Sequence, residues 1–231
     1  MELIWQGLAK AAELVFGFDA EVWAITWLSI KISGSATFVS LLLGIPLGIA
    51  LALARFPGRS TLAALVNTGM GLPPVVVGLF VTILLWRNGA LGFLELLYTP
   101  TAMVVGQLVI AAPIVTGLTL AAVQQVPEAF RLQMRGLGAS SPQMIRVLLL
   151  EARLRMLAAV MAGFGGVISE VGASMMLGGN IRGQTRVLTT ATVLETGKGN
   201  FDVAIALSVI LLLITFLVNW ALSVIQQRRR E

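Results

Sequence analysis

Long apolar stretches separated by short polar segments dominate this chain of 231 residues. A helix needs about 20 mainly apolar residues to cross the hydrocarbon core of a bilayer. Five stretches reach that length and predict an all-α, polytopic membrane protein. The predicted membrane-spanning helices are Ile32–Leu53, Leu62–Trp86, Thr101–Val123, Leu157–Leu177 and Val203–Ile225.

Two features refine these helices. The first span has an alternative start near Val22, with a bend around the Ser-Gly-Ser sequence at residues 33–35. Proline lacks a backbone N–H and clashes with the preceding turn, so we expect prolines to kink or interrupt their helices. The prolines concerned are Pro46, Pro73, Pro74 and Pro113.

The segment before the spans, Leu3–Phe16, is amphipathic rather than uniformly apolar. Gln6, Lys10 and Glu13 lie on one helical face. A helix with one polar and one apolar face typically lies in the interface of a membrane. We therefore expect an N-terminal helix on the membrane surface.

A polar stretch at residues 127–150 interrupts the apolar pattern and predicts two short helices joined at a corner. Pro127 suits the first turn of a helix that runs to about Leu137. Gly138 supplies the backbone freedom of a sharp helix end, and Ser140 or Ser141 can cap the next helix. A helix–corner–helix between membrane spans is expected to dock on a soluble partner.

The composition excludes several kinds of chemistry. Hydrophobic residues make up 57% of the chain and charged residues 12%, against about 25% charged in soluble domains. There is no cysteine and no histidine, which excludes disulfides, thiolate nucleophiles, histidine-ligated zinc and a Ser-His-Asp triad. The net charge of +5 sits at the ends of apolar segments, so it indicates membrane topology rather than nucleic-acid binding. We expect one domain, residues 1–231, with a membrane core at 22–225.

The positions of the basic residues predict an orientation. If the C-terminal arginines at 228–230 are cytoplasmic, five spans place the N-terminus outside. Ten of the 16 lysines and arginines then face the cytoplasm, including Arg131 and Arg135. This agrees with the positive-inside rule and places the helix–corner–helix in the cytoplasm.

Few polar residues occur deep within the predicted spans, and we take Gln107, Thr116, Ser169 and Glu170 as pore candidates. Glu170 is the one acidic residue well inside a span, where a carboxylate is costly and often functional. The alternative is a structural role, in which Glu170 binds Arg182, Arg186 or a backbone group.

An outer loop at residues 178–202 carries Asn180, Arg182 and Arg186. Their charges could be solvated, or could attract an anion or an acidic surface of a partner.

The corner sequence Leu137-Gly138-Ala139-Ser140 resembles the coupling loop of ABC importer permeases. That family has Glu-Ala-Ala, three residues, Gly, nine residues, then Ile, one residue and Leu-Pro. Here the glycine and its flank match, but the Glu-Ala-Ala positions hold residues 132–134, Leu-Gln-Met. The C-terminal Ile, Leu and Pro positions hold Leu148, Leu150 and Glu151.

Two further stretches resemble the oxyanion permeases of this family. Residues 168–173, Ile-Ser-Glu-Val-Gly-Ala, resemble the Gly-Glu-Phe-Gly-Ala stretch of molybdate and sulfate permeases. Residues 178–185 resemble the Gly-Asn-Ile-Pro-Gly-x-Thr loop of the molybdate group, with Arg182 in place of proline. Residues 189–199 are more similar to tungstate permeases.

The resemblance implies an ABC importer permease of the MetI-like fold that translocates tungstate, with molybdate or sulfate as the alternative. It implies a homodimer in the cytoplasmic membrane with a cytoplasmic C-terminus, two ATPase subunits and an extracytoplasmic binding protein. ATP and Mg²⁺ would bind the ATPase, and we expect no cofactor or catalytic residue in this chain, which lacks a phosphate-binding loop. The implied ATPase-coupling residues are Arg135, Gly138, Ala139 and Ser140; the residues implied to face the binding protein are Asn180, Arg182 and Arg186.

Two other classes of membrane protein fit this sequence less well. An intramembrane serine protease needs a histidine, which this chain lacks. An aspartyl protease needs acids on facing spans, whereas Glu170 is the one acid deep in a predicted span. A purely structural assembly subunit fits the composition but leaves the helix–corner–helix unexplained.

Overall fold

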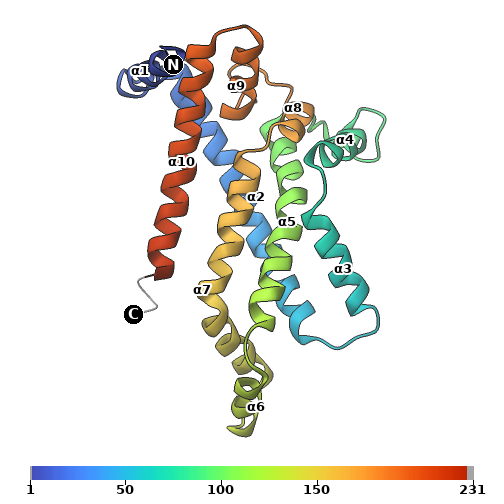
Figure 1. Cartoon of the computed structure of the whole chain (residues 1–231). Coiled ribbons are helices and arrows are strands. Elements are labelled where there is room, and N and C mark those ends of the chain that lie inside the picture. The colour runs from blue at the N-terminus through green and yellow to red at the C-terminus, as the bar shows by residue number, and fades with distance from the viewer. Residues whose placement is uncertain (1, 228–231) are drawn as a thin grey trace.

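The computed structural model describes residues 2–227, and within that range the regular structure is entirely helical (Figure 1). The chain order is α1 (Glu2–Phe16), α2 (Ala20–Leu53), α3 (Arg59–Met70), α4 (Pro74–Leu85), the short 3₁₀ helix η1 (Gly92–Leu94), α5 (Pro100–Gln124), α6 (Glu128–Gly136), α7 (Ser141–Ile168), α8 (Gly172–Gly178), α9 (Leu188–Gly197) and α10 (Phe201–Gln227). The all-α prediction is therefore confirmed for the described residues.

Three helices, α2, α5 and α10, are long and apolar enough to cross a membrane. Two bent pairs, α3 with α4 and α7 with α8, raise the number of spans to five if each pair counts as one. Five apolar segments were predicted as spans; the break within the second was expected from Pro73 and Pro74, whereas the break within the fourth was not. The segment Leu62–Trp86 bends by 103° between α3 and α4, and Leu157–Leu177 bends by 59° between α7 and α8.

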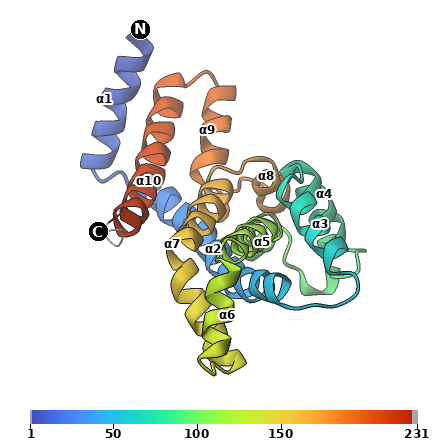
Figure 2. The same ribbon diagram turned by 60° about the horizontal axis from the view of Figure 1, so that its bottom comes forward.

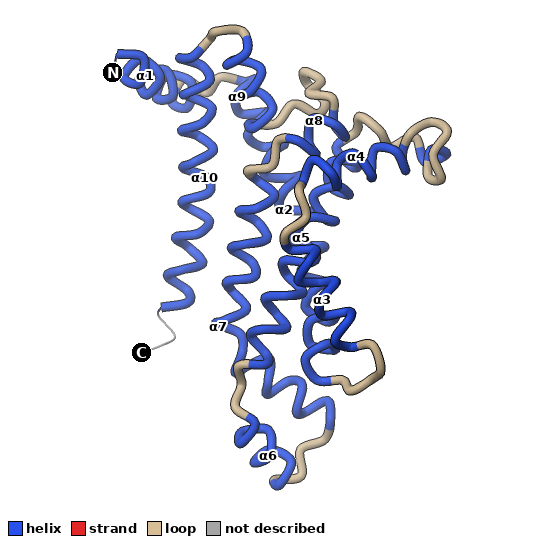
Figure 3. The backbone as a smooth tube through the Cα atoms, turned by 45° about the vertical axis from the view of Figure 1, so that its right-hand side comes forward, coloured by secondary structure: helices blue, strands red, loops and turns tan. Residues whose placement is uncertain are grey.

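Consecutive prolines explain the break between α3 and α4, which is visible in Figure 3. Helix α3 ends at Met70, and Pro73 and Pro74 begin α4. Pro73 has extended backbone angles, because the residue before a proline avoids the helical region. Pro74 lies in the first turn of α4, where a missing N–H leaves no helical bond unmade. The break thus follows from local chemistry.

The remaining prolines interrupt nothing. Pro46 lies inside α2 and Pro113 inside α5, and both helices continue through them. Helix α2 begins at Ala20, close to the alternative start near Val22 rather than at Ile32, and it continues as one helix through residues 33–35. The Asp19 side chain fixes this start, because it accepts a hydrogen bond from the Val22 N–H at 2.9 Å.

Helices α2 and α5 pack closely at the centre of the molecule. Gly44 and Gly48 face Val115, Thr116 and Thr119 of α5. A Cβ atom at Gly48 would lie 2.7 Å from the carbonyl oxygen of Thr116. Glycines four residues apart let two helix backbones approach, which is a common source of helix association in lipid.

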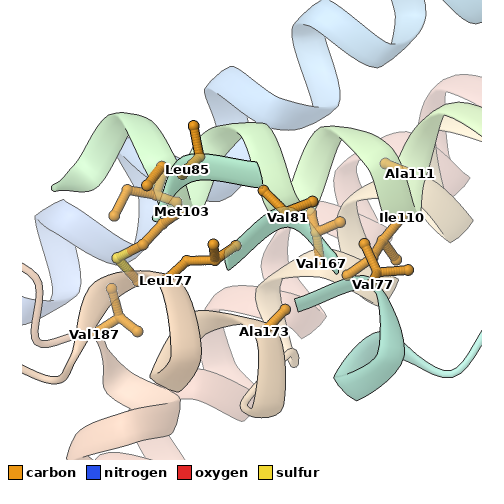
Figure 4. Packing of buried hydrophobic residues seen from close by; sticks show 12 residues of the cluster. Val77, Val81, Leu85, Met103, Ile110, Ala111, Val167, Ala173, Leu177 and Val187 are labelled. Carbon is orange, nitrogen blue, oxygen red and sulfur yellow. The ribbon is translucent and has the colours of Figure 1, made fainter. Parts of the chain in front are cut away.

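The largest apolar cluster joins α4, α5, α7 and α8 (Figure 4). Met103 of α5 lies against Leu177 of α8, and Val81 of α4 lies near Val167 of α7. Helices α4 and α8 approach so closely that a Cβ at Gly78 would lie 2.7 Å from the Cα of Ala173. The two bent pairs therefore support each other on one side of α5.

The N-terminal helix α1 packs beside the start of α10, where Gly7 faces the side chain of Ile205 (Figures 1 and 2). Its axis runs across that of α10 in Figure 1. The predicted N-terminal helix is thus confirmed, and its exposed apolar residues Leu3, Ile4 and Trp5 fit the expected position on a membrane surface.

Candidate functional site

The corner between two helices forms where the sequence predicted it. Helix α6 ends at Gly136, and Gly138 has a left-handed backbone with φ of +77°. Ser140 is the N-cap of α7, and its N–H donates to the Oε1 of Gln143 at 2.8 Å. Pro142 lies in the first turn of α7, as expected. At the other end, Pro127 is the N-cap of α6 rather than its first helical residue.

The corner projects away from the other helices. It lies at the opposite end of the molecule from α1 and α9 in Figure 3. Leu132, Arg135 and Leu137 are exposed, and no heavy atom lies within 4 Å of a Cβ built at Gly138. An exposed apolar residue beside a fixed corner suits insertion into a groove of another protein.

Helix α7 connects this corner directly to the interior. It runs without interruption from Ser141 to Ile168, whereas the sequence suggested a short corner helix followed by a separate span. A displacement of the corner would therefore reach residue 168 through one rigid helix.

Glu170 lies in the joint between α7 and α8 and is 9% exposed. Its Oε1 accepts a hydrogen bond from the Ala173 N–H at 2.9 Å, and its backbone carbonyl accepts one from the Thr189 hydroxyl at 3.0 Å. Of the roles foreseen for Glu170, binding to a backbone group is thus confirmed. Binding to Arg182 or Arg186 is wrong, because both arginines bind Glu21.

The other pore candidates do not form one site with Glu170. The Gln107 amide donates to Ser174 Oγ at 3.4 Å, and its buried Oε1 has no partner in the described part of the chain. The Thr116 hydroxyl donates to the Ala112 carbonyl of its own helix, at 2.7 Å. Ser169 is exposed and donates to the Gly165 carbonyl at 2.8 Å. Their roles in a pore remain predictions.

The predicted outer loop is partly helical, which the sequence did not show. Helix α9 occupies residues 188–197, where Thr190 Oγ1 accepts from the Val187 N–H at 3.1 Å. The Leu188 N–H donates to Ser29 Oγ at 2.9 Å, so α9 is attached to α2. The Asn180 side chain donates to the Thr190 carbonyl at 3.4 Å and helps to close the loop.

Glu21 is the partner of the loop arginines, and sequence reasoning missed it. Arg182 forms a two-pronged ion pair with the carboxylate, and Arg186 lies 3.5 Å from it. The available signal was that Glu21 is an acid in the first turn of α2. The sequence could not show its partner, because Arg182 lies 161 residues further along the chain. Arg182 is mostly exposed while Arg186 is largely covered, so Arg182 is the one available to a partner.

Two charged groups on this side have shifted pKa values. The hydrogen bond to Glu21, and then the charge of that carboxylate, raises the pKa of Arg182. Hydrogen bonds from Asn200 and Lys198 lower the pKa of Glu195 at the end of α9. Both shifts favour the charged forms.

Most of the chain matches one known family of transport proteins. Residues 44–231 match the family described as binding-protein-dependent transport system inner membrane component. The chain belongs to this family. It is therefore a transport subunit of an ABC permease and a multi-pass membrane protein, rather than an enzyme.

Curated relatives place the chain among oxyanion permeases. It is 37% identical to the tungstate uptake permease TupB of Peptoclostridium acidaminophilum, covering 98% of this chain and 100% of that one. It is 32% identical to TupB of Campylobacter jejuni, covering 95% and 92%. It is 27% identical to the molybdenum transport permease ModB of Escherichia coli, covering 90% and 96%.

Solved structures agree with the fold. A chain of the MetNI methionine ABC transporter, in an inward-facing conformation, matches with a TM-score of 0.74 and 21% identity. The match covers 91% of this chain and 98% of that one. The MetI-like permease fold is thus confirmed. Association with an ATPase and with a substrate-binding protein follows from family membership.

Proposed function

We propose that this chain is the membrane permease subunit of an ATP-driven importer for tungstate. The supporting observation is the similarity to tungstate uptake permeases over nearly the whole chain. Permeases for molybdate and sulfate resemble it less, and they define the alternative substrates. The oxyanion is cargo, so the chain needs no bound cofactor for this role.

The geometry supports a division of labour along the molecule. The exposed corner at Gly138 would dock in the ATPase, together with Arg135, Ala139 and Ser140. The outer surface at Arg182 and Asn180 would receive the binding protein. Two copies of the chain would form the pore between them, with one ATPase below each copy, because closed two-fold symmetry is the commonest arrangement of oligomers.

The proposed orientation places α6 in the cytoplasm and α9 outside. The charge bias supports it, because arginines concentrate around α6 and the adjacent ends of the spans. The proposed cytoplasmic C-terminus rests on the arginines at 228–230, which lie outside the described residues.

A competition assay between oxyanions tests which substrate the transporter prefers. The complex is reconstituted in vesicles with its binding protein, and uptake of labelled tungstate is followed with and without unlabelled molybdate or sulfate. We expect excess sulfate to have little effect, and equimolar molybdate to leave most tungstate uptake intact. Complete displacement of tungstate by equimolar molybdate would favour the alternative substrate and overturn the tungstate assignment.

Cysteine labelling tests the orientation, because the chain has no cysteine of its own. Ser141→Cys should react with a membrane-impermeant maleimide only in inverted vesicles, and Gly199→Cys should react in intact cells. Labelling of position 141 from outside would contradict the orientation, with the cysteine-free parent as the control for background.

A further inference from the structure

A basic cavity lies between the ends of the spanning helices and the coupling corner. It has a volume of about 560 Å³, within the range of about 300–1,000 Å³ that is usual for small-ligand sites. Residues from the end of α2, the start of α3, the end of α5, helix α6 and the start of α7 line it. Four of them are arginines: Arg55, Arg59, Arg131 and Arg135.

Two of the arginines are held in place by helix ends. The Arg59 Nε donates to the Leu51 carbonyl at 2.5 Å, and the Arg131 Nη2 donates to the Val123 carbonyl at 2.6 Å. Both carbonyls lie in the last turns of α2 and α5, where helix carbonyls lose their usual partners; the Val123 carbonyl also accepts from the Val126 N–H at 3.3 Å. Each guanidinium has five N–H donors, so most donors remain available. The Nε of Arg131 is shielded from solvent and has no partner among residues 2–227.

The charge of the cavity is not balanced. Glu128 is the single acidic residue of its lining, so four arginines and one glutamate leave a net charge of +3. Within the described range, none of these five side chains forms an ion pair. The guanidinium groups repel one another, and an anion placed among them would relieve that repulsion.

We propose that the basic cavity binds a phosphate-type anion, either the headgroup of an anionic lipid or a free phosphate. The planar fork of arginine matches the oxygens of a tetrahedral phosphate and binds two of them at once. The cavity is lined by Ala52 and Leu53, the last residues of α2, so in the proposed orientation its upper wall would lie near the lipid headgroups of the cytoplasmic side. Basic pockets at that level on the cytoplasmic side bind acidic lipids.

The cavity adjoins the coupling corner, so an anion bound there would affect how the corner moves. Arg135 and Ala139 line it and also belong to the coupling corner, and Ser141 lines it from the first turn of α7. A bound anion would therefore connect the end of α2 to the corner and limit its movement. This step rests on the proposed orientation, in which the corner is cytoplasmic.

Arg55 is the residue to change, because it makes no hydrogen bond in the described structure and removing it leaves both helix ends intact. Arg55→Gln removes the charge, and Arg55→Lys keeps the charge but loses the fork. Arg153→Gln is the matched control: Arg153 is exposed at the same end, on α7, and does not line the cavity.

The purified permease–ATPase complex is tested with two probes. Native mass spectrometry measures bound phosphatidylglycerol, with phosphatidylcholine as the neutral lipid, and isothermal titration measures inorganic phosphate. We expect Arg55→Gln to weaken binding of the anion about tenfold, the usual effect of losing a charge-assisted contact. Arg55→Lys should retain part of it, and Arg153→Gln should match the parent.

The pattern of results identifies the source of the anion. Loss of phosphatidylglycerol alone assigns the cavity to a lipid headgroup, and loss of phosphate binding assigns it to a soluble anion. Equal binding by Arg55→Gln and Arg153→Gln would overturn the proposal. So would unchanged anion binding with loss of ATPase assembly in Arg55→Gln, because the arginines would then serve acidic residues of the ATPase. Tungstate uptake is not part of the readout, so an error in the substrate assignment would leave this result unchanged.

Discussion

The contact between α2 and α5 gives a quantitative test of how this fold is held together. Gly48→Ala adds one methyl group where a Cβ would lie 2.7 Å from both the Thr116 carbonyl oxygen and the Thr119 Cβ. Favourable carbon contacts occur at about 3.5–4.0 Å, so the overlap is about 1 Å. The oxygen belongs to the backbone of α5, so relief requires that the two helices separate.

Two opposing effects set the magnitude. Overpacking of a close contact costs about 1–3 kcal/mol. Replacing glycine by alanine inside a helix stabilises it by about 0.5–1 kcal/mol. The difference lies between about 0 and 2.5 kcal/mol, and we expect Gly48→Ala to destabilise the permease by about 1 kcal/mol.

Gly34→Ala is the matched control, because Gly34 lies in the same helix and nothing lies within 4 Å of its built Cβ. It should be neutral or stabilising. Both variants are unfolded by sodium dodecyl sulfate from mixed micelles, with helicity followed by circular dichroism. If Gly48→Ala and Gly34→Ala unfold at the same detergent fraction, the close approach of α2 and α5 does not limit stability.

Two further variants test the corner and the helix joint. Gly138→Val should reduce substrate-stimulated ATPase activity without preventing assembly, because a left-handed residue with a side chain costs about 1–2 kcal/mol. Gly136→Val is its control, with ordinary backbone angles and open space, and equal activity of the two variants would contradict the role of the corner. Glu170→Gln should transport better than Glu170→Leu, because the amide oxygen can still accept from the Ala173 N–H, a capping bond worth about 0.5–2 kcal/mol. Equal loss in both, at unchanged expression, would show that the charge of Glu170 matters.

Local chemistry predicted the corner and the proline break well. The end of α6, the left-handed Gly138 and the Ser140 cap depend on residues within a few positions of each other. The same holds for Pro73 and Pro74, whose effect on α4 needs no tertiary contact. Apolar length alone also located the helices that span the membrane, since lipid requires every backbone group to bond within its own helix.

Features that depend on distant residues were missed. The break after Ile168 is held by the Thr189 hydroxyl, which comes from another helix. Helix α9 is anchored by Ser29, and the loop arginines are paired with Glu21 near the opposite end of the chain. No pattern within one apolar segment contains this information. The pore candidates were predicted by depth, but Gln107 meets Ser174 while Thr116 bonds its own helix, so depth does not show which residues meet.

The continuity of α7 determines how the two ends of the molecule can communicate. Its 28 residues span about 42 Å, from the coupling corner to the joint at Glu170. An uninterrupted helix transmits a displacement along its length, so the first break at which motion can change direction is this joint. There α8 packs against α4 with almost no gap at Gly78, so the two short helices must move together. The Glu170 carboxylate holds the start of α8, while its carbonyl holds α9 through Thr189. Movement of the corner is therefore expected to reach the outer side of the permease through this residue.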